Sequence, residues 1–192
     1  MRIALAALLV TSILPCAAQT FGSRPRSGNV KPGYTNRLAP YVPSPQQIVD
    51  KMLEQAGLKT GEILYDLGCG DGRILISAAQ KYRVKAVGVE LSEPLVKQTR
   101  DRIYKLNLQD FITIIHGDLL EVNLSAADVV TIYLETGANE RLRPILERDL
   151  KPGSRVVSHD FAVRGWKPTR TEKLDAFSRV HSIYLYEMPP SK

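Results

Sequence analysis

The stretch of the chain best suited to chemistry is a glycine-rich turn that begins with an acidic residue. The sequence Asp66-Leu67-Gly68-Cys69-Gly70-Asp71-Gly72 follows an apolar run at 63–65 and precedes another at 74–79. Strand, glycine turn and helix in this order hold a nucleotide-type cofactor at the carboxyl edge of a parallel sheet. Glycines permit positive φ and close approach of the backbone to a ligand. The sequence therefore predicts a cofactor-binding loop at 66–72.

The residues around the glycines indicate which cofactor this loop holds. A phosphate loop would end in Gly-Lys-Ser/Thr, and a dinucleotide fingerprint would carry Gly or Ala where Arg73 stands. A carboxylate at Asp66 repels phosphate and attracts a cation. S-adenosylmethionine (SAM) is a nucleoside cofactor that carries an ammonium and a sulfonium and no phosphate. We therefore predict SAM as the cofactor. The residues expected to bind it in this loop are Asp66, Gly68, Gly70 and Asp71.

Two further acids follow at the ends of later strands. Glu90 ends the apolar segment 84–90, about 20 residues beyond the glycine turn, which is the spacing at which an acid reaches ribose hydroxyls. A carboxylate there accepts hydrogen bonds from both hydroxyls. Asp118 follows the segment 111–116 and is expected to accept from the adenine amino group. The alternative interpretation is that both acids are solvated residues at strand ends.

The beginning of the chain differs from the rest in composition. Met1-Arg2 is followed by the apolar run 3–14 and then by Pro15-Cys16-Ala17-Ala18, which is typical of a signal peptide or N-terminal anchor at 1–18. Residues 19–40 are rich in Gly, Pro, Asn and Arg and are expected to form a basic linker. The catalytic domain is predicted at 41–188. We expect the chain to be exported or membrane-associated, or cytoplasmic if 1–18 is not a true signal.

The charge of the chain is concentrated outside the predicted domain. The formal net charge is +6, and residues 1–40 contribute five basic residues and no acidic residue. The remainder is close to neutral, so nucleic-acid binding is not expected. The three histidines and the single cysteine beyond position 18 have no spacing typical of a metal site, so no metal is expected. We expect a monomer.

Apolar periodicity along 41–188 predicts alternating strands and helices. This alternation favours an α/β fold, a doubly wound and mostly parallel sheet with a C-terminal antiparallel hairpin. Ser44 is expected to cap the first helix, with Gln47 completing a capping box, and Ser92 to cap the third helix. Strands are expected at 62–67, 84–90, 111–116, 127–134, 155–161, 169–173 and 180–188, with helices beginning near 45, 72, 92 and 137.

The same motifs resemble a known family. The glycine turn, Gly88-Val89-Glu90 and His116-Gly117-Asp118-Leu119 are similar to class I SAM-dependent methyltransferases. More specifically, 127–134 and the stretch 150–161 followed by Trp166-Lys167-Pro168 resemble the small protein-lysine methyltransferases of the ATP synthase c-subunit and adenine nucleotide carrier, and their bacterial relatives. The resemblance covers about 41–188. It implies a protein substrate that carries a target lysine, and it implies that this substrate protein is membrane-associated.

Methyl transfer depends mainly on alignment of an acceptor lone pair with the methyl group in a water-poor slot. Strands that end beside the cofactor should supply the residues that line this slot. The candidates are Tyr133, Glu135, His159 and Asp160. Each has an alternative interpretation. Tyr133 would be a packed aromatic residue and Glu135 a charge at the start of a helix. His159 and Asp160 would be a hydrogen-bonded pair at a strand end.

The function expected from the sequence is methyl transfer from SAM to a protein lysine. Two other classes remain open, a methyltransferase for small molecules and a non-catalytic exported binding module. The predicted signal conflicts with catalysis, because SAM is made in the cytosol. Either 1–18 is an uncleaved anchoring segment, or the exported protein is no longer an enzyme.

Overall fold

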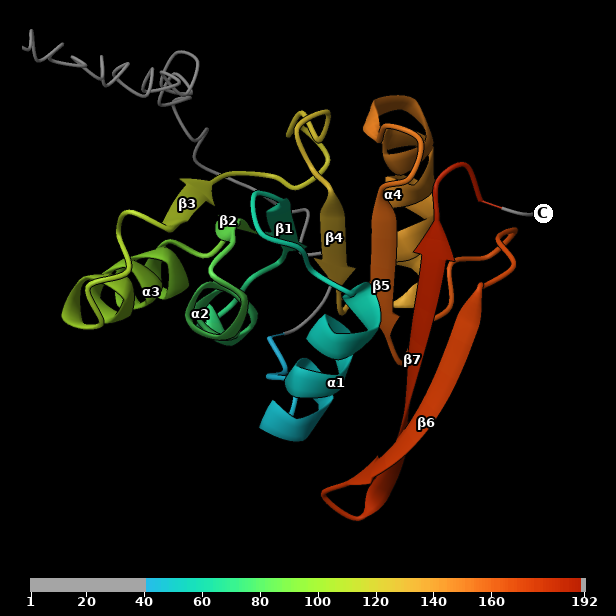
Figure 1. The fold of residues 1–192 in the computed structure, drawn as a ribbon, viewed down its shortest axis with the longest axis horizontal. Coiled ribbons are helices and arrows are strands. Elements are labelled where there is room, and N and C mark those ends of the chain that lie inside the picture. The colour runs from blue at the N-terminus through green and yellow to red at the C-terminus, as the bar shows by residue number, and fades with distance from the viewer. Residues whose placement is uncertain (1–40, 191–192) are drawn as a thin grey trace, which may run out of the picture.

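A seven-stranded sheet in the order β3-β2-β1-β4-β5-β7-β6 organises the protein (Figure 1). The structure is a computed structural model that describes residues 41–190, so the predicted segments 1–18 and 19–40 lie outside the described residues. The strands are β1 (Ile63–Leu67), β2 (Lys85–Glu90), β3 (Ile112–His116), β4 (Val129–Ile132), β5 (Arg155–His159), β6 (Arg170–Ala176) and β7 (Arg179–Glu187). The helices are α1 (Gln46–Ala56), α2 (Arg73–Tyr82), α3 (Glu93–Lys105) and α4 (Thr136–Asp149).

β1 to β5 pair with one another in parallel, and β7 is antiparallel to both of its neighbours, β5 and β6. The predicted doubly wound sheet with a C-terminal antiparallel hairpin is therefore confirmed. The chain order reverses at β1, because β2 lies on one side of this strand and β4 on the other. Such a switch point opens a crevice at the carboxyl ends of the strands.

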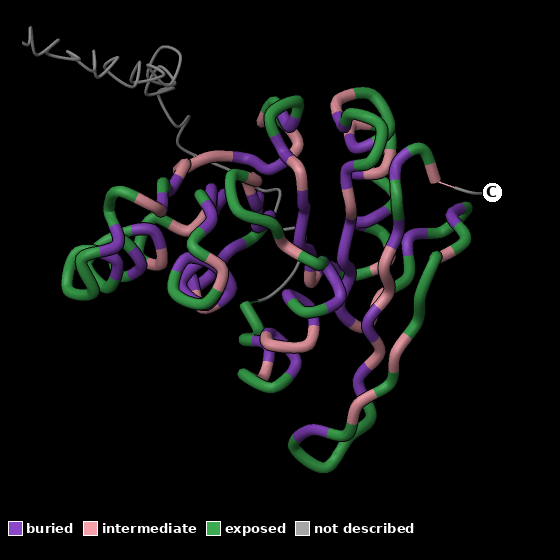
Figure 2. The backbone as a smooth tube through the Cα atoms, viewed as in Figure 1, coloured by how far each residue is buried: buried purple, intermediate pink, exposed green. Residues whose placement is uncertain are grey.

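Apolar side chains pack in two layers, one on each face of the sheet. α1, α2 and α3 cover one face, and α4 covers the other together with the loops after β3 and β5. Every residue of β4 is buried, as expected for a strand that is covered on both faces. The β6–β7 hairpin instead projects from the sheet and is largely exposed near its turn (Figure 2).

Element boundaries differ from the sequence expectation at β4 and β6. β4 is shorter than 127–134 and ends at Ile132, after which the chain leaves the sheet beside the crevice. β6 is longer than 169–173, because its pairing with β7 continues to Ala176 and Arg179. None of the helices within 41–190 is both long and apolar enough to cross a membrane.

The expected capping box at α1 is wrong. The residue at the N-cap is Pro45, and no side chain caps the helix. The Ser44 hydroxyl instead lies 2.8 Å from Nδ1 of His159, and Gln47 donates to the carbonyl of Asp175. Ser92 does occupy the N-cap position of α3, but its side chain makes no capping bond.

Candidate active site

A cavity of about 390 Å³ lies at the carboxyl ends of the strands, next to the switch point. This volume is in the range of small-molecule sites. The loops after β1, β2, β3 and β4 line it, and residues 41–44 close one side. The lining includes all six residues predicted to bind the cofactor: Asp66, Gly68, Gly70, Asp71, Glu90 and Asp118.

The glycine turn requires residues without a side chain for two separate reasons. Gly68 has φ +82°, a left-handed backbone that other residues rarely adopt. At Gly70 the ring of Tyr41 packs on the backbone, and an added Cβ would lie 2.5 Å from its Cε2. Thr99 donates to the Gly70 carbonyl at 2.7 Å, which ties the turn to α3. The backbone of the turn is thus fixed in position, with Gly68 and Gly70 in the cavity lining.

Asp66 places a buried carboxylate in the cavity wall. It is 3% exposed, and its Oδ1 accepts a hydrogen bond from Thr131 at 2.8 Å. Burial raises the pKa of Asp66 to about 7, with the nearby carboxylates adding to the effect. A cationic ligand group would stabilise the ionised form. The Asp66 carboxylate therefore fits an ammonium such as that of SAM.

Glu90 and Asp118 are fixed by backbone hydrogen bonds. Glu90 Oε2 accepts from the Gly70 N–H at 2.9 Å, and its Oε1 accepts from the Ser92 N–H at 2.8 Å. Asp118 Oδ1 accepts from the Leu120 N–H at 2.9 Å. A carboxylate has about four lone-pair sites, so both groups keep capacity for ligand hydroxyl or amino donors. Their placement fits the ribose and adenine contacts predicted from the sequence.

Asp71 also lines the cavity, but its carboxylate is engaged within the protein. Arg73 donates to both of its oxygens, at 2.9 and 2.8 Å, and Arg102 lies 3.3 Å away. Burial alone would raise the pKa of Asp71, yet these guanidinium groups hold it below its usual value. The side chain therefore fastens the turn to α2 and α3.

The four residues predicted to line the acceptor slot are placed differently from one another. Tyr133 lines the cavity. Asp160 and His159 do not line the cavity but contact Tyr133. The Tyr133 hydroxyl donates to Asp160 Oδ2 at 3.3 Å, and the ring centroids of Tyr133 and His159 are 3.8 Å apart. Glu135 is exposed at the N-cap of α4 and does not line the cavity.

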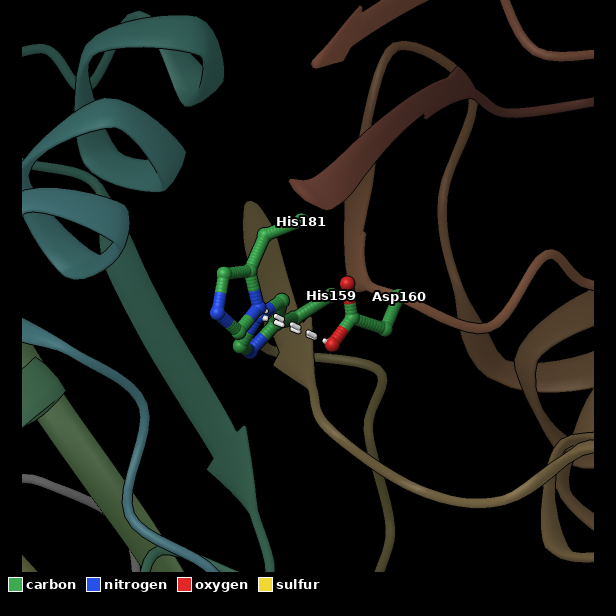
Figure 3. A group of neighbouring side chains, drawn as sticks. All are labelled: His159, Asp160 and His181. Atoms are coloured by element: carbon green, nitrogen blue, oxygen red, sulfur yellow. Dashed lines mark hydrogen bonds and ion pairs between the residues drawn. The ribbon is translucent and has the colours of Figure 1, made fainter. Parts of the chain in front are cut away.

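His159, Asp160 and His181 form a tight cluster that joins β5 to β7 (Figure 3). His159 Nε2 lies 2.8 Å from His181 Nδ1, which lies 3.0 Å from Asp160 Oδ2. Burial lowers the pKa of His159 to about 4, so its imidazole is neutral. One donor atom from each of the three residues falls within 4.8 Å of the others, an arrangement that could hold a transition metal. The expectation of no metal thus stays a prediction.

Several residues around the site were not identified from the sequence. Ser44 and His181 complete the polar contacts of His159, and Arg179 contacts Asp160 and Tyr133. His181 and Arg179 reach the cluster because β7 pairs with β5, with Ile183 opposite His159. The pairing of β7 with β5 joins segments that are far apart in the sequence, so the residues around Arg179 and His181 do not predict it.

The fold and the acid-lined cavity define a class I SAM-dependent methyltransferase. The chain belongs to the family described as the ANTKMT methyltransferase domain, whose profile matches residues 66–170. The fold is that of this family, and SAM is the cofactor.

Individual relatives support this assignment. The chain is 47% identical over 148 residues to a protein-lysine N-methyltransferase of Saccharolobus islandicus (strain REY15A), which covers 77% of this chain and 92% of that protein. It is 32% identical over 139 residues to the lysine N-methyltransferase of the ATP synthase c-subunit from Xenopus laevis, covering 72% of this chain and 61% of that protein. A crystal structure of an RNA methyltransferase from Salinibacter ruber in complex with S-adenosyl-L-homocysteine has 41% identity and a TM-score of 0.73, and covers 79% of this chain and 96% of that chain.

Proposed function

We propose that the protein methylates lysine side chains of a protein substrate. The observation that carries the proposal is the relative of Saccharolobus islandicus, a named protein-lysine N-methyltransferase that matches over 92% of its own length.

The cofactor side of the cavity binds and orients the methyl donor. SAM supplies an electrophilic methyl group on a sulfonium. In this proposal Asp66 binds the ammonium, and Glu90 and Asp118 bind the hydroxyl and amino groups of the nucleoside, which is supported by the presence of all three in the cavity lining. With three anchoring points the donor has one orientation, and the rate then depends on alignment with the acceptor.

The acceptor side carries groups suited to an amine. Tyr133 presents an aromatic ring at the cavity, and its hydroxyl meets the Asp160 carboxylate at 3.3 Å. A carboxylate attracts an ammonium, and the aromatic face accepts a cation or a methylated amine. Tyr133 and Asp160 are therefore the proposed acceptor-binding residues, with His159 holding the Tyr133 ring from behind. Glu135 stays a candidate only for contacts at the rim, since it is exposed.

The test is incubation of the protein with methyl-labelled SAM and fractionated cell lysate, followed by acid hydrolysis of the precipitated protein. Labelled methyl-lysine is the expected product, and Asp66→Asn is the inactive control. Asp160→Ala should lower the rate at unchanged SAM affinity, because it acts on the acceptor.

Other acceptors would give different outcomes in the same experiment. Label that is removed by ribonuclease would favour an RNA acceptor, the class of substrate for which the Salinibacter ruber enzyme is named. Label in the soluble, non-precipitable fraction would favour a small-molecule acceptor. SAM binding by calorimetry without any transfer would indicate a binding module.

We also propose that the substrate is membrane-associated and that residues 1–18 bring the enzyme, as a monomer, to the membrane. The apolar run led by Arg2 and the basic segment 19–40 support this, because basic residues favour the surface of an anionic membrane. An expressed fusion should fractionate with membranes, and a freely soluble protein that retains Met1 would refute the proposal.

A further inference from the structure

Arg179 is the cationic partner of the acceptor-side carboxylate. It follows the turn of the β6–β7 hairpin, and one terminal nitrogen of its guanidinium contacts Asp160 Oδ2. The same nitrogen lies 3.3 Å from the Tyr133 hydroxyl. The guanidinium thus contacts both the Asp160 carboxylate and the hydroxyl of Tyr133, and Tyr133 is the one of these three residues that lines the cavity.

The Asp160 carboxylate is built to bind a cation at this point. Its Oδ1 accepts from the Ser182 N–H at 2.9 Å, which fixes the side chain, and its Oδ2 faces the cation together with the Tyr133 hydroxyl and His181. Burial would raise the pKa of Asp160, but the Ser182 N–H and the neighbouring imidazoles hold it low, so the group is anionic. Its own backbone has φ +60°, an uncommon conformation that the β5–β7 pairing maintains.

A lysine ammonium that approaches a methyl donor in the cavity needs the same contacts that Arg179 now makes. We propose that Arg179 occupies the binding site for the ammonium of the target lysine and must be displaced when the acceptor binds. This inference rests on the proposed lysine methyltransferase function and assigns its acceptor site.

Arg179 is well placed to leave. Its side chain is 56% exposed whereas that of Asp160 is 12% exposed, so the guanidinium can return to solvent while the carboxylate stays in place for another cation. The adjacent hairpin residues Phe177 and Val180 are 84% and 58% exposed, so an incoming protein segment meets apolar side chains beside the arginine. Phe177 has φ +48°, which a bulky residue rarely adopts. The turn therefore holds an aromatic side chain outward beside the acceptor site.

The transfer step then follows once the lysine replaces Arg179. The ammonium gives up a proton to water, and the neutral nitrogen is left with a free lone pair. That lone pair forms the new N–C bond as the bond between the methyl carbon and sulfur breaks. The sulfur keeps the bonding electrons, so S-adenosylhomocysteine leaves neutral at sulfur.

The first experiment removes the competing arginine. Arg179→Ala should incorporate label from SAM into lysate proteins about two- to fivefold faster in dilute lysate, because a partly exposed ion pair no longer competes with the acceptor. The gain should shrink in concentrated lysate, since the effect is on acceptor binding. Arg170→Ala is the matched control, because Arg170 is an exposed arginine of the same hairpin that pairs with Glu172.

The second experiment converts the arginine into an acceptor. Arg179→Lys, incubated with labelled SAM in the absence of other protein, should acquire a methyl group on the new side chain, located by mass spectrometry of the peptide. Arg170→Lys should acquire none. Calorimetry with SAM and a circular dichroism spectrum would show for every variant that the fold and the cofactor site are intact.

The outcomes separate this inference from the proposed function. Faster transfer by Arg179→Ala, or a methyl group at position 179 in the lysine variant, supports the assignment. A wild-type enzyme that makes methyl-lysine, with neither effect in the variants, would overturn it. A wild type that makes no methyl-lysine, together with an unmodified lysine variant, would count against the proposed function itself.

Discussion

Asp66 is a buried carboxylate whose one direct partner within 41–190 is the Thr131 hydroxyl. Burial raises its pKa to about 7, so much of the free protein carries Asp66 protonated at neutral pH. A ligand ammonium binds the ionised form, and below this pKa each bound ligand must displace a proton.

The first prediction is that SAM affinity depends on pH through Asp66. Affinity should fall as the pH falls through about 7, approaching a tenfold loss per pH unit below it. Isothermal titration calorimetry between pH 5 and 8 measures this dependence. Asp66→Asn, the control, should bind more weakly and lose this pH dependence, because it has no carboxylate to titrate at that position. A flat profile in the wild type would mean that Asp66 does not meet the ammonium.

Glu90 is tied to the glycine turn and to the start of α3, because its two oxygens accept from the Gly70 and Ser92 N–H groups. The second prediction is that Glu90→Ala weakens SAM binding by about 1–3 kcal/mol, since ribose hydroxyls lose a charged acceptor. Gln at the same position keeps one acceptor and should lose less. Calorimetry measures the SAM affinity of the wild type and of the two variants. Equal affinities in the three proteins would mean that Glu90 does not contact the cofactor.

At the scale of elements, Arg155 joins the end of α1 to the sheet. Its guanidinium makes a two-pronged pair with Glu62, at 2.8 and 2.7 Å, and also donates to the Ala56 carbonyl at 2.8 Å. Both side chains are largely buried, so the pair is shielded from water. The arrangement fixes α1, and the residues that directly precede this helix border the cavity.

The third prediction is that Glu62→Ala lowers the free energy of unfolding by about 2–4 kcal/mol, because it leaves the Arg155 charge buried without its partner. Glu140→Ala breaks the exposed pair with Arg164 and should cost less than about 1 kcal/mol. Urea unfolding measures the two values. A loss at Glu62 no larger than at Glu140 would show that the pair with Arg155 does not stabilise the fold.

The arrangement of the strands explains which residues of the site could be predicted from the sequence and which could not. Asp66, Glu90 and Asp118 were predictable because each lies at or just beyond the end of an apolar strand, and parallel strands end at one edge. Arg179 and His181 were not, because their position depends on the β5–β7 register. Ser44 was assigned to a helix cap because the local pattern fits one, but a long-range contact with His159 takes its hydroxyl.

At the scale of the whole molecule, the proposed cofactor-binding residues all lie on the described part of the chain, residues 41–190. The first described residue that lines the cavity is Tyr41, whose ring packs on Gly70. The basic segment proposed to reach the membrane precedes this residue directly. The chain therefore separates catalysis from the proposed targeting at about position 40.

The fourth prediction concerns a variant that begins at Tyr41. Its SAM affinity should equal that of the full chain, because it retains every residue within 41–190 that lines the cavity. Its transfer of label to proteins of a membrane fraction should fall several-fold, since the segment that attracts it to an anionic surface is gone. Transfer to detergent-solubilised proteins should change little, which serves as the control for intrinsic activity. If the shortened enzyme labels intact membranes as well as the full chain does, residues 1–40 have no part in reaching the substrate. Their basic charge then needs another explanation.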